Sequence, residues 1–254
     1  MARRGGGGRR QRQRRQQVQY EELDKYPVMP PHAFARIVRD LRTLNIIYQV
    51  IEPPLTKKEE EVRSEIMDIF IQALTADIDE IDANPELYLR AAMDQIVKSY
   101  RLKVNKKSRS KIFYYLKRDL IGYGRMDVLM NDANVEDVSL DGTNIPIFAY
   151  HRKFESVETT ISWPDDPELE SYVIKLAQRC GKHISVAEPL LDATLMDGSR
   201  IVMKLGREVS TRGSTFCIRR FREDPFSPCD IVAFRTMTSL MVAYLWIAFQ
   251  NEIS

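Results

Sequence analysis

The period at which hydrophobic and polar residues repeat changes twice along the chain. Between Thr56 and Ile121 the apolar positions recur every three or four residues, which predicts helices. Thr56 opens the first helix with a capping-box pattern. Asn84-Pro85 opens the second, with asparagine as the cap and proline in the first turn. Ser108 or Ser110 is expected to cap the third. This region is therefore predicted to be a small helical domain.

Residues on both sides of the helical region alternate with the period of strands. Residues 34–51 are rich in β-branched side chains, which predicts a hairpin, with a helix for the first part as the alternative. Beyond Val135 one hairpin is expected to turn at Asp141-Gly142 and a second at Asp197-Gly198. A further strand is predicted over residues 215–219.

Two more helices are predicted in the second half of the chain. Asp166-Pro167 opens the first, with Asp166 as its cap, and Gly181 ends it in the left-handed conformation. The chain is then helical from Ile231 onward. The apolar segment 237–249 has about 13 residues, fewer than the roughly 20 that a membrane span needs. We expect a buried helix there, whose packing partner lies beyond the end of this chain.

These elements predict an α+β fold in four parts. Residues 1–30 are expected to be a disordered basic tail, and residues 31–125 a mainly helical N-terminal domain that begins with the hairpin. Residues 126–225 are expected to form an antiparallel α+β domain. Residues 226–254 are interpreted as a linker and the beginning of another domain.

Composition and charge are those of a soluble globular protein, with 44% hydrophobic and 29% charged residues. The net charge is +2, but residues 1–18 hold seven arginines and no acid, so the rest of the chain is mildly acidic. This tail either stays solvated or contacts anionic lipid or nucleic-acid phosphates. It is not a secretory signal, because no apolar segment follows the arginines.

Cysteines and histidines give no sign of a disulfide framework or a metal site. Three cysteines without a C-x-x-C spacing favour a reduced, cytoplasmic protein. The three histidines are widely separated and match no metal-ligand pattern.

Four phrases carry a family resemblance. They are YYLKRDLIGYGRMDVLMNDANVEDVSLDG (114–142), AYHRKFESVETTI (149–161), LDATLMDGSRI (191–201) and FCIRRF (216–221). In this order they resemble the N-terminal part of type II and type IV secretion ATPases, in particular the archaeal branch that drives pili, archaella and secretion. The resemblance implies a PAS-like fold for residues 126–225, followed by a RecA-like domain with Walker A and Walker B motifs. It also implies a homo-hexamer that uses ATP and Mg²⁺ on an inner-membrane platform protein, at the cytoplasmic face of the membrane.

No Walker A loop follows these phrases within the chain. Of its 11 glycines only Gly181 precedes a lysine, and Leu176 and His183 stand where that motif needs glycine and Ser or Thr. We therefore expect no catalytic residues, no metal ligands and no ATP turnover by this chain alone. We also expect it to bind no cofactor tightly.

The resemblance further implies arginines that face the nucleotide phosphates. A planar guanidinium suits this role because it neutralises charge on a transferred phosphoryl group, although arginines on hairpins are more often solvated or paired with carboxylates. The matching positions are Arg200, Arg219, Arg220, Arg207 and Arg212. Arg125 and Asp127 are interpreted as an interdomain or subunit contact, or else as a local salt bridge or turn cap.

The leading hypothesis is therefore the non-catalytic N-terminal portion of a hexameric secretion or pilus-assembly ATPase. A free-standing adaptor derived from such a motor is the first alternative. A nucleic-acid-binding protein that acts through its arginine-rich tail is the second.

Overall fold

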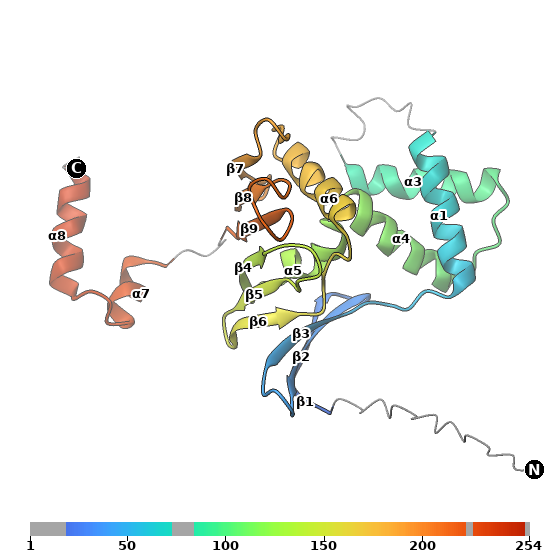
Figure 1. The fold of residues 1–254 in the computed structure, drawn as a ribbon. Helices are drawn as coiled ribbons and strands as arrows, with labels where there is room; N and C mark the ends of the chain where they lie inside the picture. Colours follow the sequence, from blue (N-terminus) through green and yellow to red (C-terminus); the bar gives the residue numbers. More distant parts are fainter. Residues whose placement is uncertain (1–18, 73–83, 222–225, 252–254) are drawn as a thin grey trace, which may run out of the picture.

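Nine strands form one sheet in the computed structural model, which describes residues 19–72, 84–221 and 226–251. The strand order is β1-β2-β3-β6-β5-β4-β9-β8-β7 (Figure 1). Every neighbouring pair is antiparallel except β3 and β6, which are parallel. The bounds are β1 Tyr20–Met29, β2 Ala33–Asp40, β3 Ile46–Ile51, β4 Val135–Leu140, β5 Phe148–His151, β6 Glu155–Thr159, β7 Leu190–Thr194, β8 Arg200–Lys204 and β9 Thr215–Arg219.

The helices fall into three groups. A bundle of α1, α3 and α4 lies beside the sheet, η1, α5 and α6 cover one of its faces, and α7 and α8 follow the last strand (Figure 1). With the sheet, they confirm the predicted α+β fold. The bounds are α1 Lys57–Gln72, α3 Pro85–Ser99, α4 Lys106–Leu120, η1 Gly124–Met126, α5 Asp127–Asn131, α6 Asp166–Arg179, α7 Pro228–Ala233 and α8 Ser239–Gln250.

The predicted helix starts are confirmed for α1 and α3 and wrong by a few residues for α4. The Thr56 N–H donates to Glu59 Oε2 at 2.8 Å, which forms one arm of the capping box. Asn84 caps α3. In α4 the cap is Asn105, whose Oδ1 accepts from the Ser108 N–H at 2.7 Å. Ser108 and Ser110, the predicted caps, lie inside the helix, because the Asn105 side chain already accepts a hydrogen bond from the first turn.

The start of α6 differs from the prediction by one residue. Asp165 is the cap, and its side chain accepts from the Glu168 N–H at 2.9 Å. Asp166 is the first helical residue, so its carboxylate is free to pair with another element. Gly181 follows the helix with φ +65°, which confirms the left-handed stop.

Strand β1 corrects the prediction that residues 1–30 are a disordered tail. It pairs with β2 over its whole length, and the outward carboxylate of Glu21 lies 3.2 Å from Arg39. Its other face reaches the main core through Leu23, Tyr26 and Val28. The hairpin predicted over residues 34–51 is confirmed and its helical alternative is wrong. The expectation for residues 1–18 lies outside the described residues.

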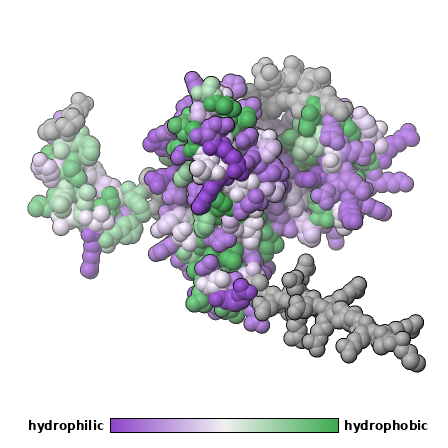
Figure 2. All heavy atoms as spheres, in the orientation of Figure 1, coloured by the Kyte–Doolittle hydropathy of each residue, from purple (hydrophilic) through white to green (hydrophobic). Residues whose placement is uncertain are grey.

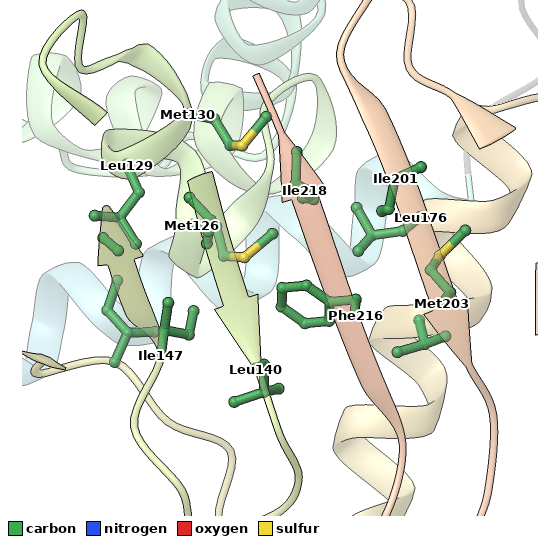
Figure 3. Close-up of a cluster of buried hydrophobic side chains, with 14 of the residues drawn as sticks. Met126, Leu129, Met130, Leu140, Ile147, Leu176, Ile201, Met203, Phe216 and Ile218 are labelled. Carbon is green, nitrogen blue, oxygen red and sulfur yellow. The ribbon is translucent and has the colours of Figure 1, made fainter. Parts of the chain in front are cut away.

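The main core lies between the sheet and the short helices that cover it. Figure 3 shows Met126 of η1 between Leu129 of α5 and Phe216 of β9, with Leu140 of β4 close to Phe216. A second core fills the three-helix bundle, and its buried members are Ile66, Leu89, Met93, Ile96, Ile112 and Leu116. The hairpins predicted around Asp141-Gly142 and Asp197-Gly198 and the strand over residues 215–219 are all present.

A buried carboxylate connects the N-terminal strands to the rest of the sheet. Asp132 is 2% exposed, and its Oδ2 accepts from the hydroxyls of Tyr26 and Tyr48, each at 2.6 Å. Burial and the neighbouring Asp132 raise the pKa of both tyrosines, so both hydroxyls remain protonated donors. The Lys153 N–H donates to Nδ1 of the buried His151, whose Nε2 lies 3.0 Å from the Tyr26 hydroxyl.

The helix predicted over the apolar segment near the end of the chain is present as α8, and its burial against a partner is not tested. It has no buried residue among those described, and Trp246 is 62% exposed. The prediction of one continuous helix from Ile231 onward is wrong, because residues 234–238 separate α7 from α8. A packing partner for α8 stays a prediction. Within the described ranges no helix is both long and apolar enough to cross a membrane.

Candidate functional site

A cavity of about 720 Å³ opens where β4 begins and β9 ends, beside α5 and the turn between β7 and β8. Basic, acidic and aromatic side chains all contribute to its wall. The lining residues are Tyr123, Met130, Asn131, Ala133, Val135, Glu136, Asp137, Arg152, Asp197, Arg219, Arg220 and Phe221. Two of the five predicted phosphate-facing arginines, Arg219 and Arg220, therefore line one cavity.

Carboxylates hold two of the cavity arginines. Arg219 Nε lies 3.0 Å from Asp137 Oδ1, and Arg152 Nε lies 3.0 Å from Glu136 Oε1. Both partners of each pair belong to strand ends or the adjoining turn, and the arginine head groups face solvent. Exposed pairs of this kind contribute about 0–1 kcal/mol, so either guanidinium can exchange its carboxylate for another anion.

Arg220 is held by the backbone instead. It donates to the carbonyl oxygens of Asp132 and Val135, the second at 2.9 Å, and it is half-buried. Carbonyl groups at the start of β4 therefore fix its position. Arg220 thus adds a third cation to the cavity wall, beside the two ion pairs.

Arg200 stands directly opposite Arg219 on the neighbouring strand, with the two residues paired in the β8–β9 register. Their side chains are 74% and 77% exposed, and Arg200 Nη2 lies 3.5 Å from Asp192 Oδ2. Two cations on adjacent strands repel each other unless acids flank them, as Asp192 and Asp137 do. The sheet register thus brings the two leading candidates together.

Arg207 and Arg212 lie at the other end of the β8–β9 hairpin, in the connection between the two strands. Arg207 Nε contacts Asp166 Oδ2 at 2.6 Å, and this bond lowers the pKa of the Asp166 carboxyl. The Arg212 carbonyl accepts from the Thr143 N–H. The structure therefore separates these two arginines from Arg200, Arg219 and Arg220.

Arg125 and Asp127 make local contacts. Arg125 donates to the Ser162 carbonyl at 3.0 Å and forms an ion pair with Glu168. Asp127 is buried and accepts from the Tyr123 N–H at 2.8 Å, as a turn cap does. Burial raises the pKa of its carboxyl. The local interpretation accounts for both side chains, and an interdomain or subunit role for them stays a prediction.

Two residues that shape the cavity have no counterpart among the sequence-based candidates. Asp197 accepts from both the N–H and the hydroxyl of Ser199, and the Ser199 hydroxyl accepts from the Phe221 N–H at 3.0 Å. The β7–β8 turn is therefore tied to the segment after β9. Tyr123 contributes an aromatic wall. The Asp197-Gly198 pair is visible in the sequence as a turn, but nothing there indicates that it meets residue 221.

The cavity lining carries cations and carboxylates in equal number. The lining includes Arg152, Arg219 and Arg220 beside Glu136, Asp137 and Asp197, and two of the arginines are ion-paired with Glu136 and Asp137. Within the described ranges no three His, Cys, Asp or Glu side chains are grouped to hold a metal ion. The arrangement suits weak, exchangeable contact with an anion.

Three proteins of Methanocaldococcus jannaschii are similar in sequence, and each is described only as uncharacterized. MJ1288 is 41% identical over 164 residues, which are 64% of this chain and 65% of that protein. MJ0900 is 35% identical over 61% of this chain and 28% of its own length, and MJ0781 is 34% identical over 55% and 19%. The chain thus spans less than two thirds of each relative. No family model matches it.

One solved structure shares a distant likeness, the VirB11 ATPase of the Brucella suis type IV secretion system in complex with sulphate. The TM-score is 0.36 and the sequence identity 17%, over 50% of this chain and 35% of that one. A likeness of this size carries no argument about the function of the present chain.

Proposed function

We propose that this chain is the N-terminal, non-catalytic part of a hexameric secretion or pilus-assembly ATPase. In this role it supplies arginines that face the phosphates of a nucleotide held by a RecA-like domain. The observation that carries the proposal is the pairing of Arg200 with Arg219 across β8 and β9, next to Arg220. All three lie in or beside the phrases that resemble this family.

The ion pairs explain how these arginines would be held when no nucleotide is bound. Asp192 and Asp137 hold Arg200 and Arg219 in exposed pairs worth about 0–1 kcal/mol each. A phosphate chain has several strong acceptor oxygens and more negative charge than one carboxylate, so it competes well once a second domain delivers it. The chain alone offers balanced charge, which supports the expectation that it binds no nucleotide tightly.

The remaining parts of the motor belong to the proposal too. ATP and Mg²⁺ would be held by the RecA-like domain, six copies would form the ring, and a platform protein at the cytoplasmic side of the membrane would receive the work. Subunit contacts would come from the exposed surfaces of this chain, Arg125 among them.

The test begins with the coding sequence beyond Ser254. We expect it to encode a Walker A domain, and the full protein to hydrolyse ATP. Replacing Arg200 or Arg219 with alanine should then lower kcat at least tenfold, because removing one preorganised charge at a phosphoryl group costs a few kcal/mol. Lys204→Ala, an exposed cation on the same strand, is the matched control. A stop codon directly after Ser254, or arginine variants with unchanged turnover, would refute the proposal.

Helix α8 favours the adaptor alternative. Its apolar surface is exposed in the described chain, as expected for a segment that docks on a separate protein. The two functions differ in a simple readout: an adaptor binds the motor in trans, whereas an N-terminal domain is covalently part of it.

A further inference from the structure

A long run of positively charged residues extends from the end of α3, through its connection to α4, and along α4. Residues 95–118 contain nine cations and no carboxylate. Four of the nine have acidic partners on neighbouring elements: Arg109 with Asp94, Lys111 with Glu59, Lys117 with Glu86 and Arg118 with Glu52. Within the described ranges no ion pair is formed by the other five, which are all exposed. We call these five the basic end: Lys98, Arg101, Lys103, Lys106 and Lys107.

The basic end lies at the outer side of the helical bundle, away from the sheet (Figure 1). Figure 2 shows strongly hydrophilic residues crowded over this part of the molecule. The first turn of α1 is close by, since Lys111 of α4 reaches Glu59 at 3.7 Å. Lys57 and Lys58 are exposed there, but Glu60 and Glu61 balance them. The excess positive charge therefore belongs to the α3–α4 connection.

Two local rules of helix stability are broken in favour of these cations. The first turn of α4 has no acidic residue and holds Lys106 and Lys107, although the positive end of the helix dipole disfavours cations. The first turns of α1, α3 and α6 each contain at least one acid. At the end of α3, Arg101 takes a left-handed φ of +52°, where glycine is preferred. Natural proteins depart from such local preferences mainly at functional sites, so cations kept at unfavourable positions indicate a functional surface.

We propose that the basic end is a docking surface for an anionic lipid membrane. Four of its five cations are lysines, compact point charges that suit a diffuse layer of headgroups, whereas phosphate recognition in nucleic acids favours the bidentate arginine. Single-stranded nucleic acid binds in grooves with several stacking aromatics, whereas residues 98–107 contain one aromatic residue, Tyr100. Tyr100, which is 57% exposed among the cations, is an amphipathic ring of the kind found at headgroup depth.

This surface is separate from the cavity arginines, so the proposal does not depend on the proposed function. It would place the helical bundle against the membrane and leave the open face of β8 and β9 free. It also differs from a contact by residues 1–18, which every variant below retains.

The experiment measures co-sedimentation of the full chain with phosphatidylcholine vesicles, with and without phosphatidylserine. The variant replaces Lys103, Lys106 and Lys107 with glutamine. The matched control replaces three exposed lysines of the strand region, Lys25, Lys153 and Lys204. Each lysine near an anionic surface contributes about fivefold to binding, so the first variant should bind the phosphatidylserine vesicles about a hundredfold more weakly. The control should stay within about threefold of the wild type.

Three results would overturn the proposal. One is equal weakening by both triple variants, which would mean that only net charge matters. Another is unchanged vesicle binding by the Lys103, Lys106 and Lys107 variant while circular dichroism shows it folded. The third is a preference for single-stranded DNA over vesicles at equal phosphate concentration, lost in the same variant, which would assign the surface to nucleic acid.

Discussion

Asp132 links two of the N-terminal strands to the rest of the molecule by hydrogen bonds. Its carboxylate accepts hydrogen bonds from the hydroxyls of Tyr26 in β1 and Tyr48 in β3. Its Oδ1 also accepts from the Asn134 N–H at 2.9 Å. Three donors satisfy one buried charge, which is the condition for a carboxylate to be tolerated at 2% exposure. Asp132 is far from Tyr26 and Tyr48 in sequence, and nothing in the local pattern distinguishes this buried acid from the acids at the surface.

Replacing Asp132 with alanine should lower the free energy of unfolding by about 3 kcal/mol, because it leaves buried hydroxyls without an acceptor. Urea denaturation followed by circular dichroism measures the change. Tyr48→Phe in the alanine background should recover part of the loss by removing one orphaned hydroxyl. The exposed Asp192→Ala serves as the control and should change stability by less than about 0.5 kcal/mol. Equal effects at Asp132 and Asp192 would contradict this account.

At the scale of single elements, helices with local signals were predictable and elements set by tertiary contacts were not. Thr56 and Asn84 each mark a helix start by a side chain that meets its own backbone. Strand β1 has no such signal: its charged residues look like tail sequence until β2 supplies Arg36 and Arg39 as partners. The arginine site was likewise only partly predictable from the sequence. The residues are named by family resemblance, but the placing of Arg200 opposite Arg219 depends on strand register.

The lysines at the start of α4 lead to a prediction about the helix itself. Lys106→Glu should raise the free energy of unfolding by about 0.3–1 kcal/mol, because it puts an acid at the positive end of the dipole. The same variant should weaken vesicle binding, so stability and docking would change in opposite directions. Thermal denaturation and co-sedimentation provide the two readouts. Lys117→Glu, near the other end of α4 and facing Glu86, should instead destabilise the protein. A Lys106 variant less stable than the wild type would refute the dipole argument.

At the scale of the whole molecule, the sheet and the last helix differ in how much of their surface is covered. The sheet buries a core on one face, whereas α8 is apolar all round and has no buried residue among those described. A helix with this composition is normally inside a protein. The apolar run is visible in the sequence, and the expectation of a packing partner outside this chain rests on it.

The full chain should therefore self-associate as its concentration rises, through the exposed surface of α8. Sedimentation velocity should detect the larger species. Changing Trp246 and Ile247 together to lysine should give a monomer, since both are 62% exposed and their replacement costs little packing in the described structure. Val186→Lys, at an exposed apolar position on the main body, should leave the association unchanged. A wild-type chain that stays monomeric at high concentration would count against this prediction.

The parallel pairing of β3 with β6 has a consequence for how the protein emerges from the ribosome. Only two residue pairs, Ile47 with Glu158 and Tyr48 with Thr159, form this junction. About 110 residues separate its two sides, so at roughly 5–20 residues per second β3 waits on the order of 10 s for its partner. During that interval the β3 edge is open to any other nascent strand. A slower codon stretch before residue 159 would lengthen the exposure, and a chaperone that covers β3 would have its greatest effect in this window.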